Sequence, residues 1–313
     1  MDKVKISVVI ATYNGEEYLG EQLDSIYNQT MPPDELIICD DRSSDNTVKV
    51  TEEYIKDHKL EGKWKIFVNE KNLGYADNFD HAAKQANGEL LFFSDQDDVW
   101  NLDKIEIMVK IMDTHPECKV LCTDYIPWYT DKSAPQAPKK VLDRMPDNGV
   151  LETVNLKKRS IYIGALGCCM CVRNDFYSAI SLYRFSGWAQ DDRMWKMAQC
   201  AHGCLLLHRN LIRHRIHGNN TSTYGKYHTV ERRVKLFTAM LDAEKQMARY
   251  LTDQNANTKE IKIVKKHISM MNKRISLINE RKILKAFSLL CYLPYYERKK
   301  SFLVELYMAF KKK

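Results

Sequence analysis

The sequence lacks several features that would assign it at once to a common class. None of its apolar runs reaches the roughly 20 residues of a membrane-spanning helix, and the longest, Ala286 to Leu293, is interrupted by Ser288. The N-terminal residues lack the long apolar core and small-residue cleavage site of a signal peptide, and we expect them to form a strand. The motifs Gly-x-Gly-x-x-Gly and Gly-x4-Gly-Lys-Ser/Thr are absent, which disfavours a dehydrogenase and a P-loop enzyme. These absences predict a cytoplasmic protein of another class.

Cysteine occurs nine times, but not in a pattern typical of cysteine-based structures. An odd number of cysteines in a chain expected to be intracellular does not predict a disulfide framework. Cys168, Cys169 and Cys171 lie in an apolar, strand-like run, in which neighbouring side chains point to opposite faces. The second Cys-x2-Cys pair that a zinc ribbon needs is missing. We therefore expect buried thiols and no zinc.

Positive charge is concentrated at the C-terminal end. The chain has 48 Lys and Arg against 41 Asp and Glu, which gives a net charge of +7. Residues 255–313 contain 15 of the basic residues and 4 of the acidic ones, so the remainder is slightly acidic. This basic segment favours contact with an anionic partner, either a membrane surface or nucleic acid.

The first hundred residues alternate between strand and helix patterns. Apolar runs predict strands at residues 6–11, 36–39, 64–68 and 89–93. Helically spaced apolar residues fill the segments between them, which is typical of a parallel sheet covered on both faces. Further along, we expect a proline-containing flexible loop at 133–148 and a strand-rich stretch at 161–172, followed by a helix at 194–200.

From about residue 228 the pattern changes to long helices. A short heptad seam runs along one of them, formed by Ile261, Val264, Ile268, Met271, Ile275 and Ile278. The seam predicts either a helix packed back on the rest of the chain, which its shortness favours, or a coiled-coil homodimer. The final residues mix apolar side chains with lysines, as in amphipathic helices that lie on anionic lipid. A solvated charged surface is the alternative.

Polar clusters stand directly after three of the expected strands. They are Thr12-Tyr13-Asn14, Asp40-Asp41 and the carboxylates within Asp95 to Asp98. Ligands of parallel sheets bind beyond the carboxyl ends of the strands, so we expect a nucleotide and metal site there. Neighbouring carboxylates are costly unless a cation neutralises them, and Mg²⁺ or Mn²⁺ completes its shell with substrate phosphates. Such a cation would stabilise a departing diphosphate. The alternative interpretation of Asp95 to Asp98 is an acidic surface loop without a metal.

Four longer motifs occur in order along residues 4–222: VVIATYNGEEYL, ELIICDDRSSDNT, NLGYADNFDHAAKQANGELLFFSDQDDVW and RHRIHGNNTS. Together they resemble family 2 glycosyltransferases of the GT-A fold, most strongly bacterial members that build surface polysaccharides such as capsule and O-antigen, including rhamnosyltransferases. The resemblance implies an α/β protein with a Rossmann-like, mostly parallel sheet flanked by helices. It places a GT-A catalytic domain at 1–225, with a nucleotide-binding half at 1–100 and an acceptor-binding half at 101–225. A basic helical C-terminal region follows at 226–313.

The resemblance also implies which residues bind the nucleotide and the sugar. Asp41 matches the carboxylate that binds the base. The surrounding nucleotide-binding positions are Ala11, Thr12, Tyr13, Asn72, Asn78 and Asp95. The positions that match the sugar or acceptor pocket are Gly167 and Cys168, with Trp188 placed to stack on a sugar ring.

Further positions match those that handle the metal and the diphosphate. Asp97 matches the metal ligand of the Asp-x-Asp motif, and Asp95 would reach the ribose or the metal, the latter directly or through a bound water. His217 would supply an imidazole to the metal or a donor to the diphosphate. Arg213 and Arg215 would clamp phosphate oxygens.

Transfer with inversion needs a base that takes the proton from the acceptor hydroxyl. The family places this carboxylate in a Glu-Asp or His-Asp context, whereas this sequence has Gln190-Asp191-Asp192, which departs from that pair. The distance onward to Gly203 favours Asp192. Asp191 remains the rival, and one of the two is then a helix cap.

The sequence therefore predicts an inverting, metal-dependent glycosyltransferase that uses Mn²⁺ or Mg²⁺. The expected donor is dTDP-rhamnose or a UDP-hexose, and the expected acceptor is a polyprenyl-diphosphate-linked saccharide. We expect the protein to be peripheral on the inner face of the cell membrane, held by its basic C-terminal helices.

Two other classes of function remain open. A sugar nucleotidyltransferase would share the sheet and the Asp-x-Asp motif, but ATYNGEEYL lacks its Gly-rich, Arg/Lys-containing loop. A noncatalytic protein that binds a sugar nucleotide or nucleic acid would not need Asp192. The apolar residues of the basic tail are mostly aliphatic rather than base-stacking aromatics, so we expect no nucleic-acid partner.

Overall fold

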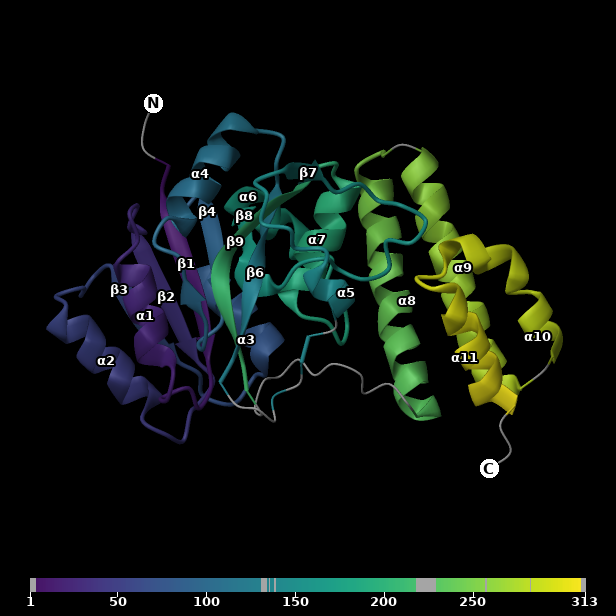
Figure 1. The fold of residues 1–313 in the computed structure, drawn as a ribbon, viewed down its shortest axis with the longest axis horizontal. Helices are drawn as coiled ribbons and strands as arrows, with labels where there is room; N and C mark the ends of the chain where they lie inside the picture. Colours follow the sequence, from purple (N-terminus) through teal and green to yellow (C-terminus); the bar gives the residue numbers. More distant parts are fainter. Residues whose placement is uncertain are drawn as a thin grey trace.

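A mixed β-sheet forms the centre of the molecule (Figure 1). The computed structural model describes residues 4–130, 134, 136–137, 139–217, 229–256, 258–281 and 283–310. Within these residues nine strands lie in the order β3-β2-β1-β4-β8-β6-β9-β5, with β7 beside β9. The strands are β1 (Ile6–Thr12), β2 (Glu35–Asp40), β3 (Trp64–Val68), β4 (Leu90–Ser94), β5 (Val99–Trp100), β6 (Val120–Tyr129), β7 (Leu151–Thr153), β8 (Met170–Arg173) and β9 (Cys204–Ile216).

The half of the sheet formed by β1 to β4 is parallel, as the sequence predicts. β1 pairs in parallel with β2 and β4, and β2 pairs in parallel with β3. In the other half β6 and β9 are parallel, but β8 runs antiparallel between β4 and β6. The short strands β5 and β7 are antiparallel to β9. The carboxyl ends of β1, β2 and β4 therefore share one edge.

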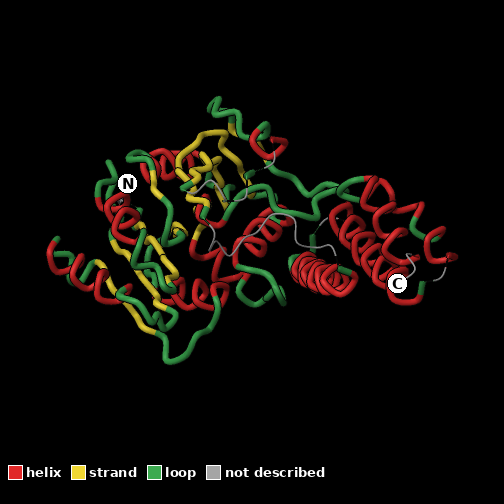
Figure 2. The backbone as a smooth tube through the Cα atoms, turned by 60° about the horizontal axis from the view of Figure 1, so that its bottom comes forward, coloured by secondary structure: helices red, strands yellow, loops and turns green. Residues whose placement is uncertain are grey.

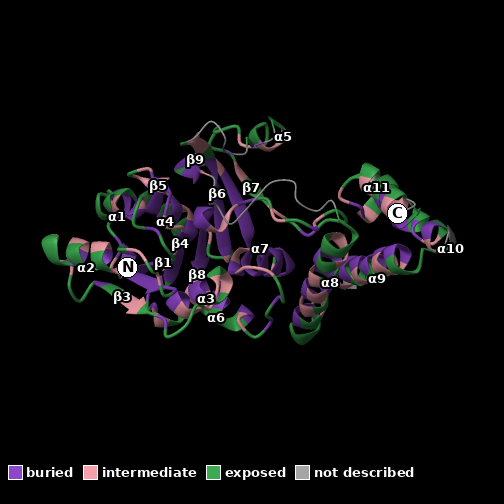
Figure 3. Ribbon diagram, turned by 90° about the horizontal axis from the view of Figure 1, so that it is seen from below, coloured by how far each residue is buried: buried purple, intermediate pink, exposed green. Residues whose placement is uncertain are grey.

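Both faces of the sheet are covered, and the strands are buried along most of their length (Figure 3). Val8 of β1 belongs to one core and Val9 to the other, because successive side chains point to opposite faces. Leu23 packs in the core of Val8, on the first face of the sheet, and Phe79 packs in the core of Val9, on the second face. The first face carries α1 (Leu19–Tyr27), α2 (Thr47–Asp57) and α4 (Lys104–Thr114); the second carries α3 (Tyr75–Gln85), α6 (Asn174–Ile180) and α7 (Gln190–Cys200).

Two predicted segments differ from the structure. Within the expected loop 133–148, residues Lys139–Leu142 form the short helix α5, in a stretch between prolines; Ser133, Pro135 and Pro138 lie outside the described residues. The expected strand-rich stretch 161–172 becomes a strand only at its end, in β8. Its apolar residue Ile161 packs against the C-terminal helices instead of entering the sheet.

The C-terminal helices pack back on the rest of the chain (Figure 2). They are α8 (Val230–Asp253), α9 (Thr258–Glu280), α10 (Ile283–Phe287), the 3₁₀ segment η2 (Leu290–Tyr295) and α11 (Lys299–Phe310). Met247 of α8 and Val264 of α9 belong to the same core as α7, and Met271 and Ile278 are buried in a further cluster. The heptad seam of α9 is thus used mainly inside the chain. Among the described residues, no helix is both long enough and apolar enough to cross a membrane.

Candidate active site

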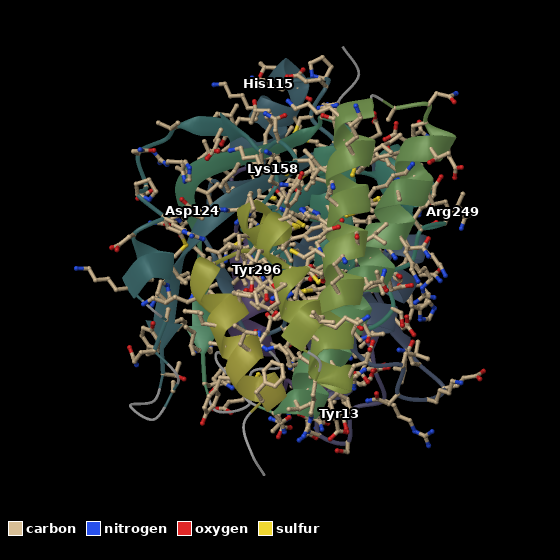
Figure 4. All side chains as sticks on the ribbon, turned by 90° about the vertical axis from the view of Figure 1, so that its right-hand side faces the viewer. Tyr13, His115, Asp124, Lys158, Arg249 and Tyr296 are labelled. Atoms are coloured by element: carbon tan, nitrogen blue, oxygen red, sulfur yellow. The ribbon has the colours of Figure 1, made fainter. Side chains whose placement is uncertain are left out.

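The carboxyl ends of β1, β2 and β4 open onto a cavity of about 1090 Å³. Loops after these strands, the start of α7 and the end of β9 complete its wall. The expected site residues that line it are Ala11, Thr12, Tyr13, Asp41, Asn72, Asn78, Asp95, Asp97, Gly167, Trp188, Asp191, Asp192 and His217. Cys168, Arg213 and Arg215 lie outside the lining. Figure 4 shows Tyr13 at the lower edge of the molecule.

Asp41 organises the loop that follows β3. Its Oδ1 accepts hydrogen bonds from the backbone N–H of Leu73 at 2.7 Å and from Asn69 at 2.9 Å, and its Oδ2 accepts from the N–H of Gly74 at 2.8 Å. Asn72 donates to the Asp41 carbonyl at 3.2 Å. The neighbouring Asp40 instead accepts hydrogen bonds from Thr12 and from Ser43, and so caps the turn that follows β2.

Asn78 joins α3 to the strand ends. It is buried, and its Nδ2 donates to the carbonyl of Cys39 at 2.8 Å, while its Oδ1 accepts from Asn69 at 2.9 Å. Asn69 also lies 2.7 Å from Nδ1 of His81. These bonds hold α3 against the ends of β2 and β3 at the cavity wall. Asn78, which is expected to bind the nucleotide, thus uses its side chain to support the wall of the cavity.

A glutamine holds the Tyr13 loop. Gln96 accepts from the N–H of Tyr13 at 2.8 Å and donates to the Tyr13 carbonyl at 3.1 Å. Gly15 lies against this amide, so a Cβ at this position would stand only 2.4 Å from Oε1 of Gln96. The phenol of Tyr13 is half exposed and stands at the cavity.

Three carboxylates crowd the loop between β4 and β5. The buried Asp98 lies 2.8 Å from Nδ1 of His214 on β9. Although burial opposes charge on both groups, this pairing lowers the pKa of Asp98 and raises the pKa of His214 to about 9. Burial, then the carboxylates of Asp98 and Asp97, raise the pKa of Asp95 to about 8. A cation bound here would relieve that repulsion.

His217 faces the same acidic loop. Its Nε2 lies 2.8 Å from Oδ2 of Asp97, and its ring centroid lies 5.2 Å from that of Tyr18. Both His217 and Asp97 line the cavity. An imidazole nitrogen and a carboxylate oxygen are thus presented side by side, next to Asp95.

The donor set of Asp95, Asp97 and His217 fits a hard divalent cation. A second group, Asp95, Asp98, Cys168 and His214, brings its ligand atoms within 4.8 Å of one another. In that group Asp98 and His214 already bond each other. A hydrogen bond with Cys169, together with burial, raises the pKa of the Cys168 thiol well above its ordinary value, and a protonated thiol is a poor ligand. Asp97 and His217 of the first set also bond each other, but all three residues of that set line the cavity, whereas Asp98 and Cys168 do not, so the first set is better placed to meet a ligand bound there.

Arg215 braces the acidic loop from behind, whereas Arg213 is exposed. Arg215 is buried and donates to the Asp97 carbonyl at 2.7 Å and to Glu21 at 2.7 Å. The guanidinium groups of Arg213 and Arg215 each lie 4.0 Å from the ring centroid of Trp128. Neither side chain lies at the cavity, where the sequence predicts contacts with phosphate. Arg215 supports the loop of Asp97 instead, and Arg213 packs on Trp128.

Asp191 and Asp192 lie in the first turn of α7, where the helix dipole favours negative charge. Burial raises the pKa of Asp192 to about 7, although Lys196 opposes the shift. The Nζ atom of the buried Lys196 lies 3.8 Å from Oδ1 of Asp192. Burial also raises the pKa of Asp191, whose Oδ1 accepts from the N–H of Asp192 at 2.8 Å. Ala189, rather than either aspartate, is the N-cap residue.

The expected sugar pocket is only partly where the sequence places it. Gly167 and the half-buried Trp188 line the cavity, and a Cβ at Gly167 would stand 3.3 Å from that of Asp191. A side chain there would push against the first turn of α7. Cys168 does not line the pocket as expected: it is 1% exposed and lies close to Asp98, behind the acidic loop.

Sequence reasoning missed four residues that shape the site. Asn69 directly follows β3, as the predicted polar clusters follow their strands, so the same signal could have found it. Lys196 stands four residues after Asp192 in the same helix, so the i, i+4 spacing could have predicted their pairing. Gln96 lies within the acidic motif, but its sequence position does not indicate that it bonds the backbone of Tyr13. Arg232 of α8 also lines the cavity, and nothing in its sequence context signals this.

Comparisons with known proteins point in one direction. The model of the family described as Glycosyl transferase family 2 matches residues 7–177, which is more than half of the chain. Over 113 residues the chain is 35% identical to the UDP-Glc:alpha-D-GlcNAc-diphosphoundecaprenol beta-1,3-glucosyltransferase WfgD of Escherichia coli, covering 36% of this chain and 42% of that protein. Over 97 residues it is 39% identical to the poly(ribitol-phosphate) beta-glucosyltransferase of Bacillus spizizenii, covering 30% of this chain and 15% of that protein. The matches thus span less than half the length of these relatives.

A solved structure shares the fold over almost the whole chain. It is the crystal structure of S. aureus TarS 1-349 in complex with UDP-GlcNAc, with a TM-score of 0.62 and 20% sequence identity. The superposition covers 95% of this chain and 83% of that one, so it includes the C-terminal helices as well as the sheet. At this identity the likeness shows the fold alone.

Proposed function

This chain belongs to glycosyl transferase family 2 and has the GT-A fold, and from that premise we propose that it is an inverting, metal-dependent glycosyltransferase of bacterial surface polysaccharide synthesis. One observation carries the proposal. The carboxylates of Asp95 and Asp97, at the end of β4, line the same cavity as those of Asp191 and Asp192, at the start of α7. A metal-bound diphosphate and a proton acceptor for the attacking hydroxyl are the two groups that such transfer needs.

The donor is proposed to bind with its nucleoside against the β1 and β2 ends. Tyr13 presents its ring there, and Asp41 holds the loop that contains Leu73 and Gly74. The donor is dTDP-rhamnose or a UDP-hexose. The UDP-Glc in the name of the Escherichia coli relative and the UDP-GlcNAc bound to the structural neighbour favour a UDP-sugar.

Asp97, Asp95 and His217 are proposed to hold Mn²⁺ or Mg²⁺. When bound, such an ion neutralises charge on the diphosphate and so makes it a better leaving group. The chain's own contribution is to bring these three side chains to one cavity, with His217 bonded to Asp97 and Arg215 holding the Asp97 backbone from behind. Asp98 stays paired with His214 and leaves the cavity to Asp95 and Asp97.

Asp192 is proposed as the general base, with Asp191 as the rival. Its carboxylate takes the proton of the acceptor hydroxyl while that oxygen forms a bond to the anomeric carbon. The bond from this carbon to the diphosphate breaks on the opposite face, and the diphosphate leaves with the electron pair. A base works best when its pKa lies near the working pH, and the pKa of about 7 fits that requirement.

The acceptor is proposed to be a saccharide carried on polyprenyl diphosphate at the inner face of the cell membrane. The diphosphoundecaprenol in the name of the Escherichia coli relative supports this class. We further propose that residues 1–225 carry out the transfer and that the helical region 226–313 holds the protein at the membrane. A coiled-coil homodimer is not favoured, because Val264, Met271 and Ile278 of the seam are buried within the chain.

The test is donor binding and donor hydrolysis by purified protein across a panel of nucleoside diphosphate sugars with Mn²⁺ or Mg²⁺. We expect one donor to bind only with metal, Asp97→Asn to abolish that binding, and Asp192→Asn to spare binding but lose turnover. Asp113→Asn, a change at an exposed aspartate of α4, is the matched control and should leave both unchanged. Loss of turnover in Asp191→Asn but not in Asp192→Asn would move the base to Asp191. Absence of binding by every donor would refute the proposal.

A further inference from the structure

The C-terminal end of the molecule exposes an unusual number of large apolar side chains. On α11 they are Leu303, Val304, Tyr307 and Phe310; on α10 and the start of η2 they are Leu284, Phe287 and Leu290. Leu284 is 76% exposed and Leu303 is 62% exposed. We call these seven residues the outer face. Spacings of three, four and seven residues place the α11 members on one side of that helix.

The outer face is not the side by which these helices pack. Phe302, Glu305 and Ala309 of α11 are buried, and Ala286 and Leu289 of the α10 segment belong to the same inner cluster. The α11 helix is therefore apolar on two sides, whereas a helix at the surface of a globular protein needs only one. Figure 3 shows α10 and α11 together at the end of the molecule farthest from β3. Exposed apolar clusters of this kind mark interaction sites.

The charges of the segment that carries the outer face are mainly positive, because its own acidic residues are turned inward; the exposed Glu280 stands just before it and pairs with Lys285 at 3.4 Å. Residues 281–310 contain two acidic residues, Glu297 and Glu305. Both bond the guanidinium of Arg274, a fully buried residue of α9, with Nε 3.1 Å from Glu305 and Nη1 3.2 Å from Glu297. Tyr296, labelled in Figure 4 among these helices, adds a bond to Glu305 at 3.1 Å.

Three basic residues of the described part of this segment face solvent, while Lys285 is half buried. Arg281, Arg298 and Lys300 are exposed. Lys266 and Lys273 of α9 extend the basic surface, with their ammonium groups 5.5 and 5.9 Å from the ring centroid of Tyr292 in η2. The result is an apolar surface bordered by basic side chains.

We propose that the outer face docks on an anionic lipid bilayer. Apolar side chains of an amphipathic helix enter the boundary between headgroups and acyl chains, and basic side chains meet the lipid phosphates. The charge pattern favours lipid over a second copy of this chain, since a two-fold contact would bring like charges together. The inference rests on the proposed function only for its purpose, which is to bring the cavity to a lipid-linked acceptor.

The test measures binding of the full chain to vesicles. Phosphatidylcholine vesicles that contain phosphatidylglycerol should bind the protein, and vesicles of phosphatidylcholine alone should bind it less, with binding weakened by salt. The double variant Leu303→Glu with Phe287→Glu should bind at least about tenfold more weakly, because two apolar anchors are lost and two negative charges are added. Leu182→Glu is the matched control: Leu182 is 72% exposed but lies after α6, outside the outer face. It should bind as the wild type does.

Two results would overturn the proposal. One is equal vesicle binding by the wild type and the double variant, or no binding by either. The other is a wild type that elutes as a dimer and a double variant that elutes as a monomer, with no binding to lipid, which would make the outer face an interface between copies. Donor hydrolysis without vesicles separates the two proposals. Lipid binding without hydrolysis of any donor would sink the proposed sugar transfer alone. Hydrolysis without lipid binding would sink the docking surface and the membrane attachment of residues 226–313, and would leave the sugar transfer standing.

Discussion

Replacing Lys196 with methionine should shift the pH dependence of sugar transfer to higher pH. Lys196 is 1% exposed, and its Nζ lies 3.8 Å from Oδ1 of Asp192 and 5.1 Å from the ring centroid of Trp188. Asp191 is the other charged group that acts on Asp192, and it favours the protonated form. With a pKa of about 7, Asp192 is about half ionised at neutral pH, and the ammonium of Lys196 helps to keep it so.

The size of the effect follows from the distance. Two unit charges about 4 Å apart interact by about 4 kcal/mol at an effective dielectric constant of about 20, which corresponds to about three pKa units. Water in the cavity reduces this, so we take one unit as the lower bound. The ionised fraction of Asp192 at pH 7 then falls from about one half to about one tenth, and the rate falls about fivefold or more. Because only the ionised carboxylate accepts the proton, activity should return as the pH rises.

The assay is kcat/KM against pH, from about pH 6 to pH 10, at saturating metal. Lys196→Arg keeps the charge and should keep the wild-type profile. Thermal unfolding of both variants shows whether the buried site still folds. A profile of Lys196→Met that superimposes on that of the wild type would refute the coupling between Lys196 and the base.

Three further predictions concern other contacts. Gly15→Ala should weaken donor binding about tenfold in calorimetry, because the new methyl displaces Gln96 from the backbone that it holds; Gly20→Ala, which meets open space, should not weaken binding and should add up to about 1 kcal/mol to urea stability. Arg274→Leu leaves two glutamates buried without their cation and should cost about 3–5 kcal/mol in urea unfolding; an unchanged midpoint would contradict this. Asp95 must lose its proton to bind a cation, so Mn²⁺ affinity should rise about tenfold per pH unit up to about pH 8 and then level off, and a flat dependence would speak against this ligand.

The fold of the first hundred residues follows from local pattern. The strands at 36–39 and 64–68 are predicted to within a residue. The first is an apolar run buried on both faces, and the second is an edge strand that keeps three apolar residues in a row although Lys65 and Val68 are exposed. The stretch 161–172 is also apolar, but Ile161 packs on the C-terminal helices. Apolar character predicts burial there, whereas the partner that buries it is set by the tertiary structure.

The site is predictable as a place and less so as a set of contacts. Strand ends bring Asp41 and Asp95 to one cavity, as their positions in the sequence predict. Arg213 and Arg215 depart from expectation because alternation along β9 does not reveal which aromatic or acidic group each long side chain will reach. Their contacts with Trp128 join segments more than 80 residues apart, and no local pattern carries such information.

Three Asp-Asp pairs at the site show what remains undetermined by residue type. Asp40 bonds Thr12 and Ser43 inside a turn, while Asp41 holds a loop at the cavity. In the second pair, Asp97-Asp98, the first residue meets His217 at the cavity and the second is buried against His214. In the third pair, Asp191-Asp192, the second residue meets Lys196. Adjacent identical carboxylates thus acquire different partners and pKa values, so the assignment of a base or a metal ligand depends on hydrogen bonds that only the folded chain provides.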